Sequence, residues 1–252
     1  MKKIFKYACA AVAATLSFTS CSNEVDMFEK AGKTAKIDLN ITNDNAMLTR
    51  ATQTADNDVW FASVDNATMA AASSIISQSY TTGSHTIKVA NFASEANAYD
   101  GAGSAYYEGS TTKELTKGTN SVSIDCGKAK NSMVSVDWSG TADVEGLTMT
   151  NVVAAQTTKS RSFTYTAKGD AFFYAGTDVV CTINYTYNGE TKTISKTITA
   201  PAAATKYALS IGANSNGTIT SLTITYDDAM GTGATTTTTI DAATGAEAQA
   251  NS

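Results

Sequence analysis

The chain contains very little histidine, arginine and proline. Its 252 residues include one histidine, His85, one proline, Pro201, and two arginines, Arg50 and Arg161. A Ser–His–Asp or Cys–His catalytic site would have to use His85, and a zinc site would find no second histidine. A net charge of −5 and a pI near 4.9, without a basic stripe, argue against nucleic acid as a partner. We therefore expect no enzyme activity, no bound metal or cofactor and no nucleic-acid partner.

Other segments that could carry chemistry do not change this expectation. Gly101-Ala102-Gly103 lacks the third glycine of a dinucleotide-binding fingerprint, and Asp56-Asn57-Asp58 lacks the spacing of a known calcium loop. His85 itself begins a strand-like run on the same side as Ile87 and Val89. That position favours a histidine at the edge of the core.

Long apolar runs are also missing, since no segment approaches the ~18–20 apolar residues of a membrane-spanning helix. A shorter apolar stretch, Tyr7–Phe18, follows a lysine-rich start, as in a signal peptide. It ends in Phe18-Thr19-Ser20-Cys21, which resembles the lipobox of bacterial lipoproteins; the alternative is an ordinary signal peptide with a chance cysteine. We expect residues 1–20 to be removed and lipid on Cys21 to anchor the chain to a membrane.

The residues after Cys21 indicate where the anchored chain would go. Residues 21–33 form a short polar tether that includes Glu24 and Asp26. It resembles the tethers of surface lipoproteins in Bacteroidota-type bacteria, although a simple solvated linker explains it equally well. We expect the chain at the outer membrane, on the cell surface.

The sequence is rich in the alternating patterns of half-buried strands. Ile37, Leu39 and Ile41 alternate with polar residues in the first of these runs. Ser121–Cys126 and Met133–Trp138 show the same period, and their short polar link predicts an antiparallel pair. Further strands are expected in the following segments: Val59–Val64, Ile75–Tyr80, His85–Ala90, Thr111–Leu115, Leu147–Val153, Arg161–Ala167, Ala171–Tyr174, Asp178–Tyr187, Thr191–Thr199, Tyr207–Ile211 and Thr218–Tyr226.

These patterns predict an all-β fold, an antiparallel β-sandwich of immunoglobulin or transthyretin type. Asn188-Gly189 is the strongest hairpin signal, and Pro201 ends the strand that follows it. The length allows one large sandwich or two small ones over residues 34–228, with a possible subdivision near 140–145. Residues 229–252 contain almost no large apolar side chain and are expected to be a flexible tail.

A long irregular segment, Asn91–Gly109, interrupts the strands. Loops of this length in compact β domains are often functional. Tyr99, Tyr106 and Tyr107 lie in it and, if exposed, could stack on sugar rings. The alternative is that a tyrosine folds back over the sandwich.

Two cysteines occur in the predicted strands. Cys126 shares a face with Val122 and Ile124, and Cys181 shares one with Ile183, so both point inward. An export compartment permits a disulfide between them, but a free buried cysteine has the same orientation. The sequence leaves both states open.

Several short motifs occur in an order that resembles a known family. They are Thr49-Arg50-Ala51, Ile87-Lys88-Val89-Ala90-Asn91, Tyr106-Tyr107-Glu108-Gly109, Ser121–Cys126, Asn131–Val136 and Ala171–Tyr174. Together, over roughly Gly32 to Asp228, they resemble a domain-of-unknown-function family of Bacteroidota surface lipoproteins, related to fimbrillin and Mfa-like proteins. The resemblance implies a lipid-anchored β-sandwich without an established enzyme activity.

We therefore expect a membrane-anchored surface lipoprotein with a structural or adhesive, fimbria-associated role; glycan binding is the alternative. Its partners would be surface protein subunits or glycans. In fimbrillin-type pilins, cleavage at an arginine removes the first strand, and Arg50 lies where such a cut would fall. Thr235–Thr239 makes a poor donor strand, because it lacks alternating apolar side chains. We expect Arg50 to stay uncut and residues 36–41 to stay in the sheet.

Overall fold

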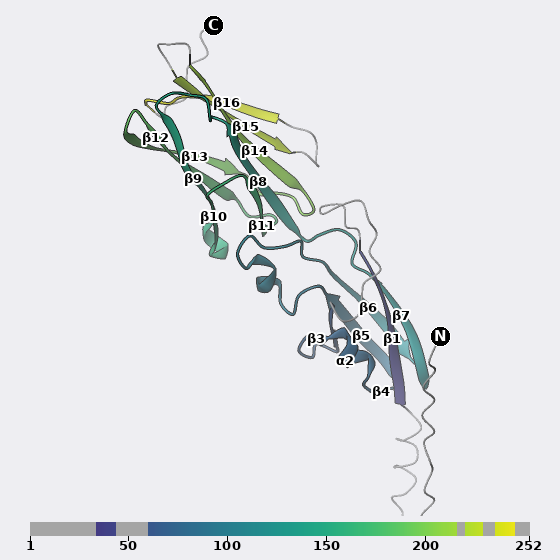
Figure 1. Cartoon of the computed structure of the whole chain (residues 1–252). Coiled ribbons are helices and arrows are strands. Elements are labelled where there is room, and N and C mark those ends of the chain that lie inside the picture. The colour runs from purple at the N-terminus through teal and green to yellow at the C-terminus, as the bar shows by residue number, and fades with distance from the viewer. Residues whose placement is uncertain (1–33, 44–59, 216–219, 229–234, 245–252) are drawn as a thin grey trace, which may run out of the picture.

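The computed structural model describes residues 34–43, 60–215, 220–228 and 235–244, most of them in strands (Figure 1). These strands form four sheets, which pack in pairs as two β-sandwiches stacked end to end. The all-β sandwich prediction is confirmed. The predicted signal peptide, Cys21 and Arg50 lie outside the described residues. None of the helices among the described residues has the length and apolar character that spanning a bilayer requires.

The first sandwich contains a three-stranded and a four-stranded sheet. Short helix α2 (Ala72–Ile76) contacts strands of both sheets and buries Ile75. In the three-stranded sheet the order is β4 (Tyr80–Thr81), β1 (Thr34–Thr42) and β7 (Gly118–Asp125). In the four-stranded sheet the order is β3 (Ala70–Ala71), β2 (Phe61–Val64), β5 (Gly83–Ala90) and β6 (Glu108–Leu115).

The second sandwich contains a four-stranded and a five-stranded sheet. In the four-stranded sheet the order is β10 (Arg161–Tyr165), β9 (Leu147–Gln156), β12 (Val179–Tyr187) and β13 (Glu190–Ile198). In the five-stranded sheet the order is β11 (Gly169–Tyr174), β8 (Asn131–Gly140), β14 (Lys206–Ser215), β15 (Thr220–Asp228) and β16 (Thr235–Asp241).

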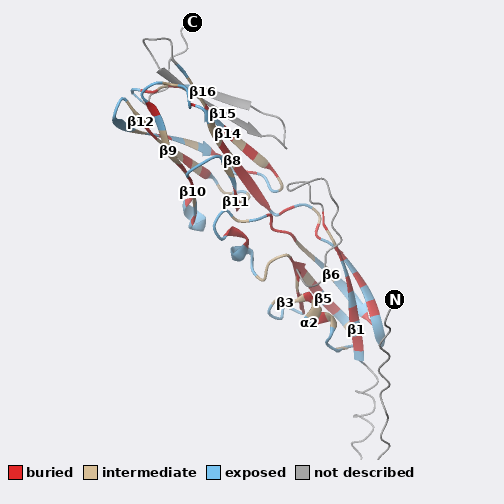
Figure 2. Cartoon of the chain, viewed as in Figure 1, coloured by how far each residue is buried: buried red, intermediate tan, exposed pale blue. Residues whose placement is uncertain are grey.

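Each sandwich has its own cluster of buried apolar side chains. Figure 2 colours the buried residues red along the strands of both sandwiches. The first includes Ile37, Leu39 and Ile41, as their alternation predicts. The second includes Ile183 and Leu209. Along β8, the first cluster ends at Met133 and the second begins at Val134. Residues 140–145, where a subdivision was expected, form the turn between β8 and β9 inside the second sandwich.

The paired strands β8 and β11 contribute to both clusters. Met133 lies opposite Phe172 in their register, and both side chains pack in the first cluster. The next residue along each strand, Val134 and Phe173, packs in the second. Because successive side chains point to opposite faces of a strand, this strand pair of the second sandwich also covers the adjoining end of the first cluster.

The predicted antiparallel pairing of the Ser121–Cys126 and Met133–Trp138 runs is wrong. β7 instead pairs in parallel with β1, and β8 belongs to the other sandwich, where it pairs with β11 and, in parallel, with β14. The short link between them passes from one sandwich to the next. A period of two shows that a segment is a strand but does not identify its partner.

Two further expectations need correction. Most of the Ile75–Tyr80 segment is not a strand, because α2 occupies its start and only Tyr80 enters β4. The flexible tail is wrong for part of its length, since β16 pairs with β15 over seven residues. Ile240 of β16 is 1% exposed in the second cluster, so the strand is held by a buried side chain as well as by its pairing with β15.

The Asn188-Gly189 hairpin is confirmed. Tyr187 pairs with Glu190 across the turn between β12 and β13. Asn188 and Gly189 both have a positive φ, 50° and 84°. A two-residue turn with both central residues in this region matches the right-handed twist of the flanking strands.

Candidate functional site

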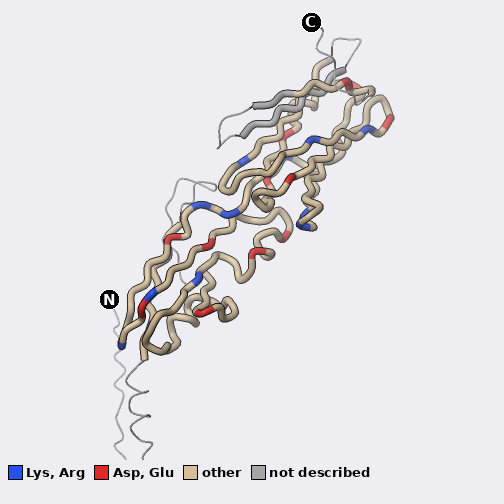
Figure 3. The backbone as a smooth tube through the Cα atoms, turned by 180° about the vertical axis from the view of Figure 1, so that it is seen from behind, with Lys and Arg blue, Asp and Glu red and all other residues tan. Residues whose placement is uncertain are grey.

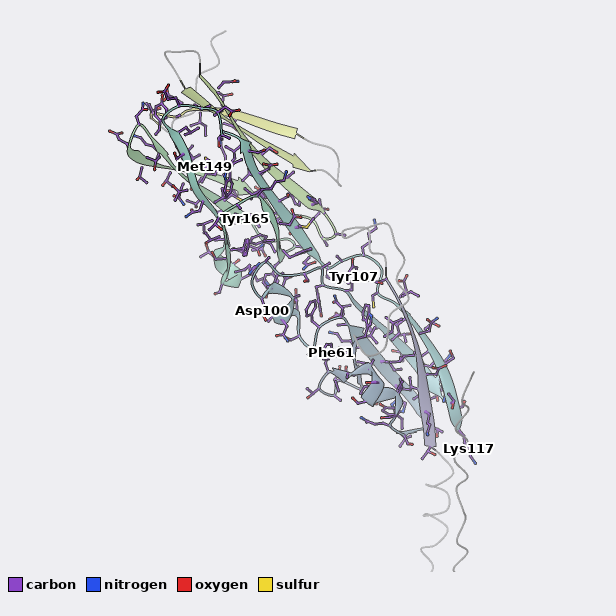
Figure 4. The ribbon with its side chains drawn as sticks, viewed as in Figure 1. Phe61, Asp100, Tyr107, Lys117, Met149 and Tyr165 are labelled. Atoms are coloured by element: carbon purple, nitrogen blue, oxygen red, sulfur yellow. The ribbon has the colours of Figure 1, made fainter. Side chains whose placement is uncertain are left out.

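The predicted ligand segment lies between the two sandwiches, where Figure 4 labels Asp100 and Tyr107. It contains a short 3₁₀ helix, η1 (Glu95–Tyr99). Tyr99, Tyr106 and Tyr107 are only 6%, 5% and 2% exposed and belong to the first cluster. The prediction that they form an exposed sugar-binding loop is therefore wrong. The segment fills the junction of the two sandwiches, and its tyrosines supply the apolar surface there.

The tyrosine hydroxyls in this segment have acidic partners or stay buried. The hydroxyl of Tyr106 donates to Oε2 of Glu108 at 2.6 Å, and Nζ of Lys88 contacts the same oxygen at 2.6 Å. Burial, with the neighbouring Glu108 carboxylate, raises the pKa of Tyr106 far above its ordinary value. Burial likewise raises the pKa of Tyr99. Both tyrosines are therefore neutral hydrogen-bond donors at any physiological pH.

Arg161, at the start of β10, ties this segment to the second sandwich. Its Nη1 donates to the carbonyl oxygen of Tyr99 at 2.6 Å, and its Nε donates to that of Phe172 at 3.0 Å. The residue is only 7% exposed, and within the described residues its Nη2 has no hydrogen-bond partner. Burial lowers its pKa, but an arginine stays protonated across the physiological range.

Aromatic rings surround the Arg161 charge. Its guanidinium carbon lies 5.2 Å from the ring centre of Phe173 and 5.9 Å from those of Tyr99 and Phe163. The Tyr99 ring also packs on Tyr174, with ring centres 3.9 Å apart. Cation–π contacts of this kind offset part of the cost of burying a charge.

Backbone and amide hydrogen bonds complete the junction. The backbone N–H of Phe172 donates to the carbonyl of Ala102 at 2.8 Å. The fully buried Asn131 accepts from the N–H of Tyr106 at 3.0 Å and donates to the carbonyl of Ser104 at 2.8 Å. The irregular backbone is thus satisfied by β8 and β11, which explains how a long loop can be buried.

His85 occupies a different place, at the edge of the first sandwich. Its Nδ1 contacts Oδ2 of Asp65 at 2.6 Å, and Oδ1 of Asp65 accepts from the N–H of Thr86 at 3.0 Å. Its Nε2 lies 2.9 Å from the carbonyl oxygen of Thr81 and 3.4 Å from the Thr81 hydroxyl. To act as a general base, Nε2 of His85 would have to accept the proton of a hydroxyl. The Thr81 carbonyl oxygen already occupies that position beside Nε2. This group therefore connects β4, β5 and the β2–β3 turn.

The two cysteines do not form a disulfide. Cys126 and Cys181 are both free and buried, and they lie in different clusters. Burial raises the pKa of each thiol to about 12, so neither is a reactive thiolate. The disulfide alternative is wrong because the chain passes into the second sandwich between the two residues.

Charged residues lie scattered along both sandwiches, with both signs interspersed (Figure 3). Among the described residues, no group of three or more metal-binding side chains comes together. A cleft of about 380 Å³ opens in the second sandwich, between η2 (Thr157–Lys159) and the start of β12. Thr157, Thr177 and Asp178 are among its lining residues.

Sequence reasoning found the strands around these sites but missed Arg161, Asn131 and the cleft. Arg161 stood out only as one of two arginines, at the start of a predicted strand. Nothing in its neighbours along the chain indicates burial, because its partners Tyr99 and Phe172 come from segments 62 and 11 residues away.

Comparisons with known proteins give a family and two distant structures. No curated protein matches the chain. Among the solved structures that resemble it are two that are each called a "putative cell adhesion protein". The one from Bacteroides ovatus is 12% identical over 71% of this chain and 92% of its own length, with a TM-score of 0.36. The one from Bacteroides fragilis is 13% identical over 57% of this chain and 65% of its own length, with a TM-score of 0.33.

The family comparison covers most of the described structure. Residues 53–242, more than half of the chain, match the model of a domain of unknown function, DUF4493. The matched range includes parts of both sandwiches and the junction between them. The expected membership in a domain-of-unknown-function family is confirmed: the chain belongs to the DUF4493 family.

Proposed function

We propose that this protein is a lipid-anchored surface protein with a structural or adhesive role and no enzyme activity. In this proposal, lipid on Cys21 holds it at the outer membrane, and the two sandwiches face outward. The second sandwich meets the partner, which is a surface protein subunit or a glycan. The sequence supports the anchor through the apolar stretch Tyr7–Phe18 and the lipobox-like residues before Cys21.

One observation carries the proposal: the described chain begins at the end of the molecule away from the second sandwich. β1 runs parallel to β7, and the end of β7 at Asp125 leads directly toward β8. Thr34 therefore lies at the far end of the first sandwich (Figure 1). A membrane anchor before Thr34 would place the first sandwich next to the membrane and hold the second one away from it.

The junction also suits a spacer. The sandwiches are connected by backbone, side-chain and apolar contacts, which come from Arg161, Asn131 and the shared strands β8 and β11. A spacer with such a junction keeps its outer end at a fixed distance, whereas a flexible linker would let it fold back.

The proposed anchor is tested by producing the wild-type chain and the Cys21→Ser variant in the bacterium that naturally makes the protein. The wild-type chain should be in the membrane fraction and be cut by protease added to intact cells. The variant should be released, and cells producing it should lose adherence to surfaces or to each other. Membrane association of the variant would contradict the anchor, and unchanged adherence would contradict the adhesive role.

A further inference from the structure

The cleft in the second sandwich is lined by polar side chains with unused hydrogen-bonding capacity. The lining residues are Thr157, Thr158, Gly176, Thr177, Asp178 and Val180. Within the described residues, the three threonine hydroxyls make no hydrogen bond. Asp178 uses only Oδ1, which accepts from the N–H of Ala200 at 2.8 Å. Three hydroxyls and one carboxylate oxygen are therefore available to a ligand.

A buried glutamine fixes both walls of this cleft. Gln156 is fully buried, and its Oε1 accepts from the N–H of Tyr174 at 2.9 Å. Its Nε2 donates to the carbonyls of Tyr174 and Thr177, both at 2.7 Å. Thr157 follows it directly in the chain, so one side chain positions residues on the two sides. Binding to groups that are already positioned costs less conformational entropy.

The size and charge of the cleft indicate the class of ligand. A volume of about 380 Å³ lies in the range of small-molecule sites. The lining contributes one negative charge, and the nearby Lys159 lies over the Tyr174 ring at 5.1 Å. The methyl groups of the threonines and of Val180 offer apolar contact beside the hydroxyls. A ligand with alternating C–H and O–H groups and no charge matches this lining.

We propose that this cleft binds a neutral saccharide unit of a glycan. The inference rests on the proposed surface role and names the ligand class for it. The hydroxyls of Thr157, Thr158 and Thr177 would exchange hydrogen bonds with sugar hydroxyls. Oδ2 of Asp178 would accept from one or two of them, and Val180 would contact a C–H face.

The test uses the intact chain, purified in detergent, on an array of neutral and acidic glycans. The best neutral glycan is then titrated by calorimetry. Thr177→Val keeps the shape and removes one hydroxyl, and Asp178→Asn keeps the acceptor for Ala200 and removes the charge. Because each variant loses one group that exchanges a hydrogen bond with the ligand, it should weaken binding roughly tenfold, which corresponds to about 1.4 kcal/mol.

Thr148→Val is the matched control, since Thr148 is an exposed residue of β9 outside the cleft. It should bind like the wild type. Absence of glycan binding, binding restricted to acidic glycans, or equal affinity in all three variants would each overturn the proposal. Failure of the proposed surface role is read separately, from the membrane anchoring and protease accessibility of the wild-type chain on intact cells, because the anchor proposed at Cys21 does not depend on the cleft.

Discussion

Arg161 brings a positive charge into the junction between the sandwiches and uses it to satisfy two buried carbonyls. An unpaired buried carbonyl costs about 1–3 kcal/mol, so removing both donors is expensive. We expect Arg161→Met, which keeps much of the apolar stem, to lower the free energy of unfolding by about 2–4 kcal/mol. Chemical denaturation followed by circular dichroism measures the change.

Lys117→Ala is the control for this prediction, because Lys117 is an exposed cation away from the junction that makes no side-chain hydrogen bond or ion pair with the described residues. It should change stability by less than about 0.5 kcal/mol. Equal stability of Arg161→Met and the wild type would show that the guanidinium contributes nothing to the junction.

Asp65 gives a pH dependence whose sign follows from its contacts. The backbone N–H of Thr86 and then the contact with His85 lower the pKa of Asp65 in the folded chain. A lowered folded-state pKa gives stability that is present above the unfolded value of ~3.9 and is lost as the pH falls through the folded value. The stability difference between wild type and Asp65→Asn should therefore be present at pH 7 and shrink below about pH 4.

The Asp65 effect should be small and salt-sensitive, since the side chain is half exposed. Asp143→Asn is the comparison, because this exposed carboxylate makes no side-chain hydrogen bond to the described residues. If the stability difference between the wild type and Asp65→Asn grew as the pH fell, this would contradict the lowered pKa assigned to Asp65.

At the scale of elements, the sequence predicts best where one strand face is buried and the other is solvated. β1 and the β12–β13 hairpin have that arrangement, and both are predicted correctly. β8 differs, because Asn131–Val134 are buried at every position. Both its faces are covered, so alternation alone does not identify its neighbours.

Candidate sites were harder to predict than strands. The tyrosines of residues 91–109 are as compatible with an exposed loop as with a buried one. Their burial depends on Arg161, Asn131 and Phe172, which come from distant parts of the chain. The cleft depends in the same way on Gln156. Such contacts between distant parts of the chain leave no recognisable pattern in the sequence around these residues.

β1 carries a prediction about processing at Arg50, which lies outside the described residues. Its eight register pairs with β7 and the burial of Ala35, Ile37, Leu39 and Ile41 make it a full member of the first sandwich. Its removal would expose this apolar face and the edge of β7. We expect the mature chain to retain β1, and N-terminal sequencing of protein from native cells should find no chain that starts at Ala51.

At the scale of the molecule, the shared strands predict a single unfolding transition. The two tryptophans report on different sandwiches, since Trp60 lies in the first cluster and Trp138 packs against the second. Variants with Trp60→Phe or Trp138→Phe each leave one reporter. Because β8 and β11 belong to both clusters, we expect the two fluorescence midpoints in denaturant to coincide.

Phe172 and Phe173 test the same coupling by mutation. Phe172→Ala opens a cavity in the first cluster and Phe173→Ala in the second, each at a cost of about 3–5 kcal/mol. Either variant should shift both tryptophan signals together. Separate midpoints, or a shift confined to the sandwich with the cavity, would mean that the sandwiches unfold independently.

The position of Phe172 along the chain also sets the order in which the two sandwiches can finish folding during synthesis. Chains emerge from the ribosome with the N-terminus first. The strands of the first sandwich have all emerged by Asp125, but Met133 and Phe172 of its apolar cluster come later. The nascent first sandwich therefore has an open end until β11 has left the ribosome. A chaperone that covers this end would act during that interval, and a stalled chain ending before Gly169 would present the same open end permanently.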